Sequence, residues 1–122
     1  MKRRWPKENI ALVDTIDRLK AHTRETGAAL WRDIALRLER PRSQWAEPNL
    51  SRLNRHTNEV SSTVVVAGSL LGTGNVDGPR EVAAWRVSKT AQKKIEAEGG
   101  EVITLDELME RHPKGIGVMI LG

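Results

Sequence analysis

One segment of eighteen residues limits the possible folds more than any other part of the chain. It begins at Ser88 and reads SKTAQKKIEAEGGEVITL. Serine caps helix N-termini, so the segment predicts a helix over residues 89–98. Gly99 and Gly100 are typical of a helix end, and the run EVIT that follows favours a strand. We therefore predict part of a β-α-β unit, in which Ile95 packs the helix onto a sheet while the lysines face outward.

Three further strand patterns lie in the second half of the chain. TVVVAG (63–68) is β-branched and bounded by glycine, and EVAAWRV (81–87) and GVMIL (117–121) show similar patterns. Thr104 and Glu107 have the spacing of a capping box, which predicts a helix over LDELMER. The second half therefore alternates strands and helices.

The first half has helical periodicity instead. We predict helices over residues 7–26, 29–40 and 48–58, with Gly27 ending the first and Pro41 stopping the second. The first helix is expected to bury one apolar stripe of Leu12, Val13, Ile16 and Leu19.

The predicted fold class is α/β, with a helical, basic N-terminal half joined to a small mixed α/β C-terminal half. A chain of 122 residues can bury a core without disulfides or metals, and we expect a single domain over residues 1–122. Within it, residues 1–6 form a basic arm, 7–60 the helical half and 61–122 the α/β half.

The positive charge is concentrated in the first half. Residues 1–60 hold 13 Lys and Arg against 8 Asp and Glu, whereas residues 61–122 hold 7 against 8, which together give the net charge of +4. Such asymmetry favours a polyanionic partner, either nucleic acid or an anionic membrane. No apolar run approaches the roughly twenty residues of a membrane span, and the basic start lacks the apolar region of a signal peptide. We expect a soluble, uncleaved protein.

Residues with catalytic or metal-binding spacing are scarce. The absence of Cys excludes a disulfide framework and any thiolate metal site, and the three His are far apart in sequence. GTGNVDG has glycines at 72, 74 and 78, one residue too long for the dinucleotide fingerprint, and a strand pattern rather than a helix follows it. We predict a turn between two strands, no cofactor, no metal and no enzyme; a small enzyme that uses this loop remains the alternative.

The strongest binding signal is RLERPRSQWAEPNLSRLNRH, residues 37–56, in which arginines bracket a proline-rich turn. Guanidinium groups suit phosphate oxygens, and hydroxyl and amide groups suit sugar and phosphate. An ordinary solvated charged face is the alternative. The candidate nucleic-acid-binding residues here are Arg37, Arg40, Arg42, Ser43, Gln44, Trp45, Arg52, Arg55 and His56, and the basic arm adds Lys2, Arg3 and Arg4.

Three stretches taken together resemble one known family. RPRSQWAEPNLSRL at 40–53, VVVAGSLLGTG at 64–74 and the segment from Ser88 are similar, in this order, to the large-subunit ribosomal proteins of the L-eighteen-e family, whose C-terminal half is related to the bacterial protein L-fifteen. The length is similar to that of the archaeal form. The helix, glycine pair and strand from Ser88 are the most specific part.

The resemblance implies a structural, non-enzymatic constituent of the large ribosomal subunit. Its implied partners are large-subunit rRNA and neighbouring ribosomal proteins, with no membrane and no small-molecule substrate, in the cytoplasm on the ribosome. It implies rRNA-facing roles for residues in the arginine-rich stretch, and Lys89, Lys93 and Lys94 are expected to reach further phosphates. An RNA-binding regulatory or assembly protein that acts outside the ribosome remains the alternative.

Overall fold

The computed structural model describes residues 7–56 and 63–121 and combines helices with one parallel sheet. The helices are α1 (Lys7–Thr26), α2 (Ala29–Leu38), α3 (Leu50–His56), α4 (Lys89–Ala97) and α5 (Leu105–Arg111), with a short 3-10 helix η1 (Arg42–Gln44). The strands are β1 (Thr63–Leu70), β2 (Glu81–Val87), β3 (Glu101–Ile103) and β4 (Val118–Ile120). All strand pairs are parallel and their order is β3-β2-β1-β4. The predicted α/β class is confirmed.

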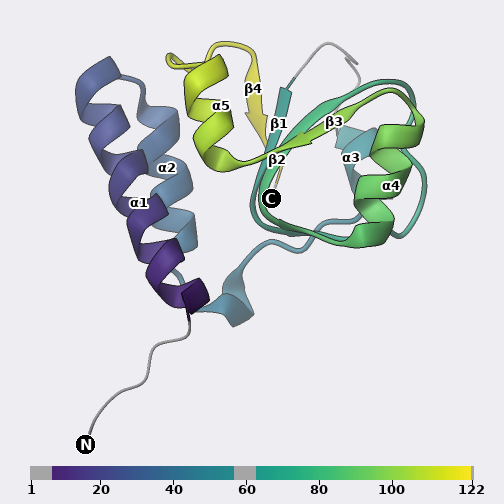
Figure 1. Ribbon diagram of the computed structural model, residues 1–122, viewed down its shortest axis with the longest axis horizontal. Helices are drawn as coiled ribbons and strands as arrows, with labels where there is room; N and C mark the ends of the chain where they lie inside the picture. Colours follow the sequence, from purple (N-terminus) through teal and green to yellow (C-terminus); the bar gives the residue numbers. More distant parts are fainter. Residues whose placement is uncertain (1–6, 57–62, 122) are drawn as a thin grey trace, which may run out of the picture.

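The sheet lies between two helical layers (Figure 1). Helices α1, α2 and α5 cover one face, and α3 and α4 cover the other. Successive side chains of a strand point to opposite faces, so Val65 and Ala67 of β1 join the first layer while Val64 and Val66 join the second. Both faces of β1 are therefore buried, which explains why its sequence is a continuous apolar run rather than an alternating one.

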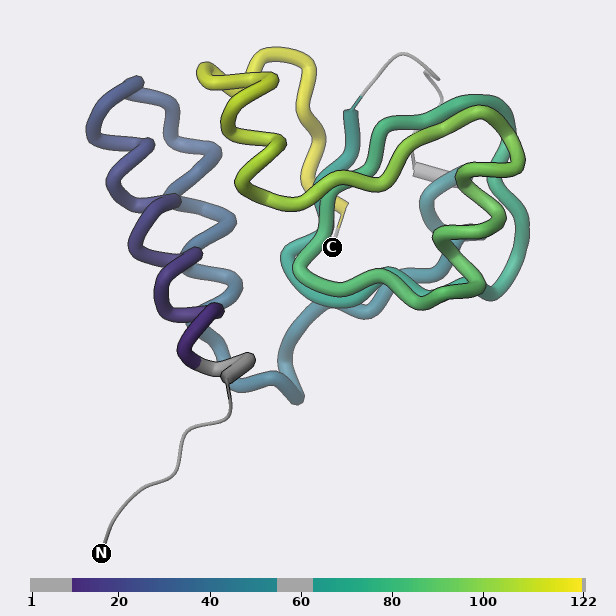
Figure 2. The backbone as a smooth tube through the Cα atoms, in the orientation of Figure 1, coloured from purple at the N-terminus to yellow at the C-terminus, as the bar shows by residue number. Residues whose placement is uncertain are grey.

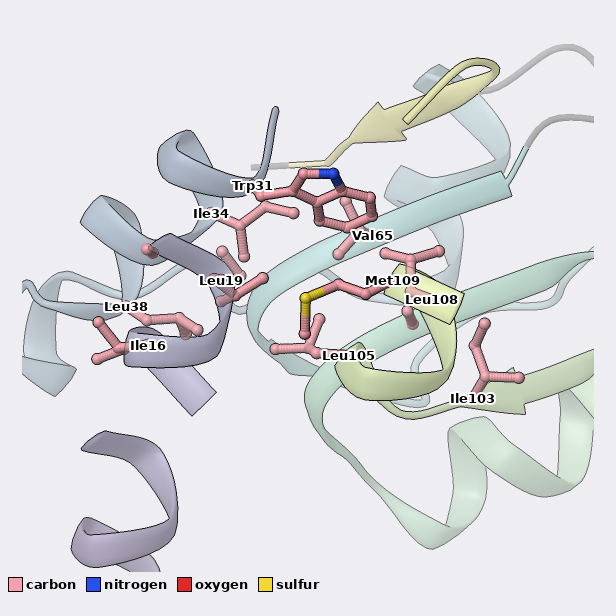
Figure 3. Close-up of a cluster of buried hydrophobic side chains, with 13 residues drawn as sticks. Ile16, Leu19, Trp31, Ile34, Leu38, Val65, Ile103, Leu105, Leu108 and Met109 are labelled. Atoms are coloured by element: carbon pink, nitrogen blue, oxygen red, sulfur yellow. The ribbon is translucent and has the colours of Figure 1, made fainter. Parts of the chain in front are cut away.

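The core between the sheet and α1, α2 and α5 is built around Trp31 (Figure 3). This side chain has no exposed surface, and its indole Nε1 donates a hydrogen bond of 2.9 Å to the carbonyl oxygen of Pro113. The ring of His22 contacts it edge-on, with 5.1 Å between the centroids. Buried residues from both halves of the chain complete this core: Ile16, Leu19, Ile34, Ala35, Leu38, Val65, Ala67, Ala83, Ile103, Leu105, Leu108 and Met109.

The second core lies between the sheet and helices α3 and α4. Ala91 and Ile95 project from α4 and are fully buried, as the β-α-β interpretation predicts. They meet Leu50 and Leu53 of α3, which are also fully buried. Each layer of helices therefore has its own apolar contact with the sheet.

Replacing Ile95 with Ala is expected to lower the free energy of unfolding by about 2–5 kcal/mol, because the buried side chain leaves a cavity that the surroundings only partly close. Chemical denaturation of both proteins measures the difference. Gln92→Ala, at an exposed position on the same helix, is the control and should stay within about 0.5 kcal/mol of the native chain. An unchanged melting temperature for Ile95→Ala would contradict the burial of this side chain.

Local capping explains where the later helices begin. The Ser88 hydroxyl oxygen accepts a hydrogen bond of 3.1 Å from the Ala91 amide, at the start of α4. At α5 the Thr104 hydroxyl oxygen accepts from the Glu107 amide, and the Glu107 carboxylate accepts from the Thr104 amide. Both predicted caps, including the capping box, are confirmed.

Several predicted details need correction. Val13 is not part of the buried stripe: its side chain is 56 % exposed, because α1 turns Ile16 and Leu19 towards the core and Val13 lies to one side of that face. Helix α2 ends at Leu38 rather than residue 40, since Pro41 disfavours helical backbone in the residue before it. Helix α3 begins at Leu50, and its predicted end at residue 58 lies outside the described residues.

An ion-pair network joins the first residues of three strands to the end of α5. Glu81 accepts hydrogen bonds from the Thr63 hydroxyl (2.7 Å) and from Arg111 (2.7 Å), and His112 Nε2 lies 2.8 Å from its carboxylate. Arg111 also holds Glu101 through two bonds of 2.9 Å. Burial opposes ionisation of Glu81, but the hydrogen bonds from Thr63, His112 and Arg111 outweigh it and lower the pKa of this carboxyl to about 2.

The lowered pKa of Glu81 predicts a loss of stability in acid. The Glu81 carboxylate binds a proton more weakly in the folded chain than in the unfolded chain, where the carboxyl group has its ordinary pKa of 4.5. Its contribution is therefore present above about pH 5 and lost as the pH falls towards 2. Because water screens this partly buried carboxyl, the contribution is smaller than the roughly 3 kcal/mol that the full shift would give. We expect the free energy of unfolding to fall more between pH 7 and pH 2 in the native chain than in Glu81→Gln. Equal losses in the two proteins would contradict this role.

Candidate nucleic-acid interface

The segment between α2 and α3 carries most of the predicted binding residues. Figure 2 shows it crossing from the α1–α2 layer to the far side of the sheet, where α3 begins. Within it, Pro41 has a φ of −53° and an extended ψ of 144°, and η1 follows as a single turn. We call residues 37–45 the arginine corner.

Trp45 fixes the shape of the arginine corner. Its indole Nε1 donates a hydrogen bond of 2.9 Å to the Arg40 carbonyl oxygen, and its backbone amide donates one of 3.0 Å to the Arg42 carbonyl. The Arg42 guanidinium lies 5.3 Å from the centroid of the Trp45 ring, a cation–π distance. The half-buried ring also packs against the first core. The corner is thus tied to itself and to the fold, so its cationic groups are held on a defined turn.

The chain just after the corner is joined to the sheet. Ala46 and Pro48 accept hydrogen bonds through their carbonyl oxygens from Ser69 (3.1 Å) and Leu71 (2.9 Å), beside the last residues of β1. Gly68 lies against Ala46 so closely that a Cβ there would clash with the Ala46 carbonyl oxygen. The segment therefore continues the edge of the sheet beyond β4, and Gly68 is the residue that lets it approach.

The structure brings together the corner residues predicted from the sequence. Arg40, Arg42, Ser43 and Gln44 are all exposed, close to one another along a single turn. Arg37 is half-buried, and its Nε forms an ion pair of 3.0 Å with Asp33 one helical turn earlier. The corner thus presents several guanidinium groups and two neutral polar side chains to solvent.

The remaining predicted residues have different positions. Arg52 is exposed on α3. Arg55 and His56 belong to the same helix, but their side chains lie outside what the structure describes, as do Lys2, Arg3 and Arg4 entirely. Their assignment to RNA binding stays a prediction.

Lysines on α4 fall into two groups. Lys89 and Lys93 are exposed, as the outward-facing prediction states. Lys94 is half-buried, and its Nζ donates hydrogen bonds of 2.8 and 2.7 Å to the carbonyl oxygens of Gly72 and Gly74. The ammonium group of Lys94 thus holds the glycine-rich loop, a role that the sequence analysis missed.

The glycine-rich loop is a close-packed connection between β1 and β2. The Thr73 carbonyl oxygen accepts hydrogen bonds from the amides of Leu50 (3.0 Å) and Ser51 (3.3 Å), which would otherwise be open at the N-terminus of α3. Gly74 has a φ of +91°, and a Cβ there would clash with the Ser51 hydroxyl. The loop does connect two strands and has Gly74 and Gly78 at positive φ, as predicted, but it is an extended crossover rather than a turn, because β1 and β2 are parallel. No helix begins in this loop to receive a pyrophosphate.

Two other kinds of site are absent from residues 7–56 and 63–121. No group of three or more His, Cys, Asp or Glu side chains lies in a position to hold a metal ion. Across the same ranges, no helix has both the length and the apolar composition that crossing a bilayer requires.

The interface residues that sequence reasoning missed act by positioning. Gly68 places the segment after the corner. The sequence pattern predicts it as the end of a strand, whereas β1 continues to Leu70, and a glycine inside a strand marks a close approach of backbone. Lys94 was assigned to the surface because its spacing fits an exposed helical face. Only the fold shows that the loop carbonyls lie within its reach.

Comparisons with known proteins agree with these features. The family model for ribosomal protein 60S L18 and 50S L18e matches residues 1–122. A large ribosomal subunit protein eL18 from Methanothermobacter thermautotrophicus is 43 % identical over 113 residues, which cover 93 % of each chain. Its counterpart in Methanopyrus kandleri is 44 % identical over 93 % of this chain and 92 % of its own, and that in Methanoregula boonei 40 % over 99 % of both. The chain belongs to the family of ribosomal protein 60S L18 and 50S L18e.

Proposed function

We propose that this chain is a structural constituent of the large ribosomal subunit and binds large-subunit rRNA through arginine and lysine contacts to the phosphate backbone. Membership of the L18e family supports the ribosomal assignment. The proposed contact residues are those predicted from the sequence, with the arginine corner as the centre. The role is structural rather than catalytic, and it places the protein in the cytoplasm on ribosomes.

The arrangement of the arginine corner is the observation that carries the proposal. Exposed guanidinium groups of Arg40 and Arg42 stand on a turn that Trp45 ties to its own backbone. Phosphate contacts supply most of the affinity and fix the register of a protein on RNA, and they gain from cations that are already positioned. Ser43 and Gln44 on the same turn add neutral donors for sugar and phosphate oxygens.

Lys94 has a separate part in this proposal. Because its ammonium group holds Gly72 and Gly74, it supports the loop that covers the start of α3, the helix that carries Arg52. Lys94 therefore contributes to RNA binding indirectly, by holding Arg52 in position. The exposed Lys89 and Lys93 on α4 supply direct phosphate contacts.

Neighbouring ribosomal proteins are the second proposed class of partner. Membership of the L18e family supports this class of partner. Several large apolar side chains also remain exposed, although such residues are common on protein surfaces and carry no argument by themselves. They are Ile10, Val13, Leu36, Leu71, Ile116 and Met119, with exposures from 40 % to 79 %.

Co-sedimentation with ribosomal subunits from the protein's own source tests the proposal. The chain is expected in the large-subunit peak at low salt and after a high-salt wash, because many simultaneous contacts hold it there. Absence from that peak, with the chain shown to be folded by circular dichroism, would overturn the ribosomal assignment. Association with free RNA alone would favour a regulator or assembly protein outside the ribosome.

A further inference from the structure

A small pocket opens beside the arginine corner, on the side that faces the sheet. Its volume is about 160 Å³. Arg37, Arg40, Gln44 and Trp45 form its polar and aromatic walls, and Ala67 and Leu121 line it from the core. Ala67 and Leu121 are only 3 % and 4 % exposed, so this pocket reaches the interior of the fold rather than lying flat on the surface.

The side chains around the pocket combine three kinds of chemistry. Two guanidinium groups can pair with a phosphate, the Gln44 amide can both donate to and accept from the edge of a base, and the indole of Trp45 offers an aromatic surface. The ion pair between Arg37 and Asp33 uses Nε, which leaves the terminal nitrogens of Arg37 for a ligand. Arg40 forms no ion pair with any residue that the structure describes.

Trp45 lines two neighbouring hollows, and different residues accompany it in each. A larger hollow of about 530 Å³ on the α1 side is lined by Arg40, Arg42 and Trp45 among others, whereas Arg42 does not line the smaller pocket. Trp45 and Arg40 therefore stand between the two. Arg42 takes up ring surface towards the larger hollow, and the hydrogen bond to the Arg40 carbonyl fixes the indole in place.

The volume limits what the pocket can hold. Drug-sized ligands occupy roughly 300–1,000 Å³, whereas an apolar cavity of about 150 Å³ accepts one benzene ring. A pocket of about 160 Å³ thus has room for one six-membered ring. Single-stranded segments of RNA are commonly recognised by splaying out a base, which then stacks on an aromatic or guanidinium plane.

We infer that this pocket binds one unstacked pyrimidine nucleotide of an RNA strand, with the base against Trp45 and Gln44 and its phosphate on Arg37 and Arg40. The inference rests on the proposed rRNA-binding function and adds to it a site for a single base. Contacts to phosphate alone position a protein on RNA, whereas a pocket for a base selects which nucleotide lies there. The arginine corner would then recognise an unpaired residue in addition to backbone shape.

Titration of the ¹⁵N-labelled full chain with uridine monophosphate tests the inference by NMR. The indole N–H signal of Trp45, identified by its loss in Trp45→Phe, and the Gln44 side-chain amide signal are expected to shift and saturate. Adenosine monophosphate is expected to bind more weakly, and inorganic phosphate is expected to leave the indole signal in place. Absence of a shift with uridine monophosphate, or full reproduction of it by phosphate, would overturn the inference. Equal binding of the purine would overturn the pyrimidine assignment.

Two variants with the same change in charge provide the control. Gln44→Glu replaces the amide at the base position with a carboxylate in the same pocket as the bound phosphate, whose negative charge it repels, and is expected to weaken uridine monophosphate binding by about tenfold. Gln92→Glu, at an exposed position on α4, is expected to leave this binding unchanged. Equal weakening by both would show a general charge effect and no pocket. If the chain stays in the large-subunit peak but does not bind uridine monophosphate, the inference about the pocket is overturned and the proposed function stands. If the chain binds uridine monophosphate but does not associate with ribosomes, the proposed function is overturned and the pocket stands.

Discussion

Binding of this chain to large-subunit rRNA is expected to weaken by a factor on the order of 10³ to 10⁵ between about 50 and 200 mM salt. The factor applies if about six to ten phosphates are neutralised. Each contact releases counterions from the RNA into solution, and this release becomes less favourable as the salt concentration rises. Among the described residues, the arginine corner, α3 and α4 carry too few exposed cations to reach this number of phosphate contacts alone. They reach it together with the predicted basic arm and the end of α3. Fluorescence anisotropy across a salt series measures the slope.

A matched pair of variants measures how much the arginine corner contributes to the salt dependence of RNA binding. Arg40→Gln removes one proposed phosphate contact and should lower the magnitude of the slope by about 0.7–0.9. Arg24→Gln makes the same change of charge in the last turn of α1, well away from the corner, and should leave the slope unchanged. A binding constant that does not respond to salt, or equal slopes for the two variants, would contradict the proposed mode of binding.

Replacing Trp31 with Ala is expected to cost about 3–5 kcal/mol, the largest effect of a single substitution in the first core. The indole has no exposed surface and joins helix α2 to the sheet and to α5 (Figure 3). Its loss also leaves the carbonyl oxygen of Pro113 without its indole donor, which adds to the cost of the cavity. Because domains of this size are stable by only about 5–15 kcal/mol, the variant loses a large fraction of its stability.

Chemical denaturation measures the loss of stability, and two further variants serve as comparisons. Trp31→Phe keeps most of the apolar volume but has no N–H for the Pro113 carbonyl, so its stability should lie between those of the native chain and Trp31→Ala. Leu36→Ala on the same helix removes a side chain that is 43 % exposed and should cost much less. Native-like stability of Trp31→Phe and Trp31→Ala together would contradict the central position of this residue.

Helix ends were predictable because they depend on local chemistry. The Ser88 cap and the Thr104–Glu107 capping box each involve atoms within three residues of one another, so their sequence spacing is sufficient to identify them. The buried strand β1 was recognisable for a similar reason, since an unbroken β-branched run bounded by glycine is typical of a strand covered on both faces.

Features that depend on distant segments were not predictable in the same way. The strand order β3-β2-β1-β4 follows from packing between elements, and no sequence pattern states that β4 lies beside β1. Val13 has the apolar character of its neighbours, but the direction in which α1 docks decides that it stays exposed. Lys94 resembles the surface lysine before it, although its ammonium group is bound by loop carbonyls that lie 22 and 20 residues earlier in the sequence.

The candidate site shows the same division. Residue types and spacing were enough to select the arginine corner, whereas the hydrogen bond from Trp45 to Arg40 and the pocket towards Leu121 require the folded chain. The single-domain organisation stays a prediction, although the first core combines residues of the helical half with those of the α/β half.

The position of β4 sets an order on the folding of this chain during synthesis. Strand β1 ends at Leu70, but its second neighbour begins only at Val118, and Leu121 then donates a backbone hydrogen bond of 2.9 Å to Val65. Local helices can form as soon as they leave the exit tunnel, whereas a pairing across this separation waits until β4 has emerged as well. Until then one edge of β1 is open, with unpaired backbone groups and apolar side chains. Nascent chains of this protein are therefore most exposed to aggregation or chaperone capture after β1 has left the tunnel and before β4 has done so.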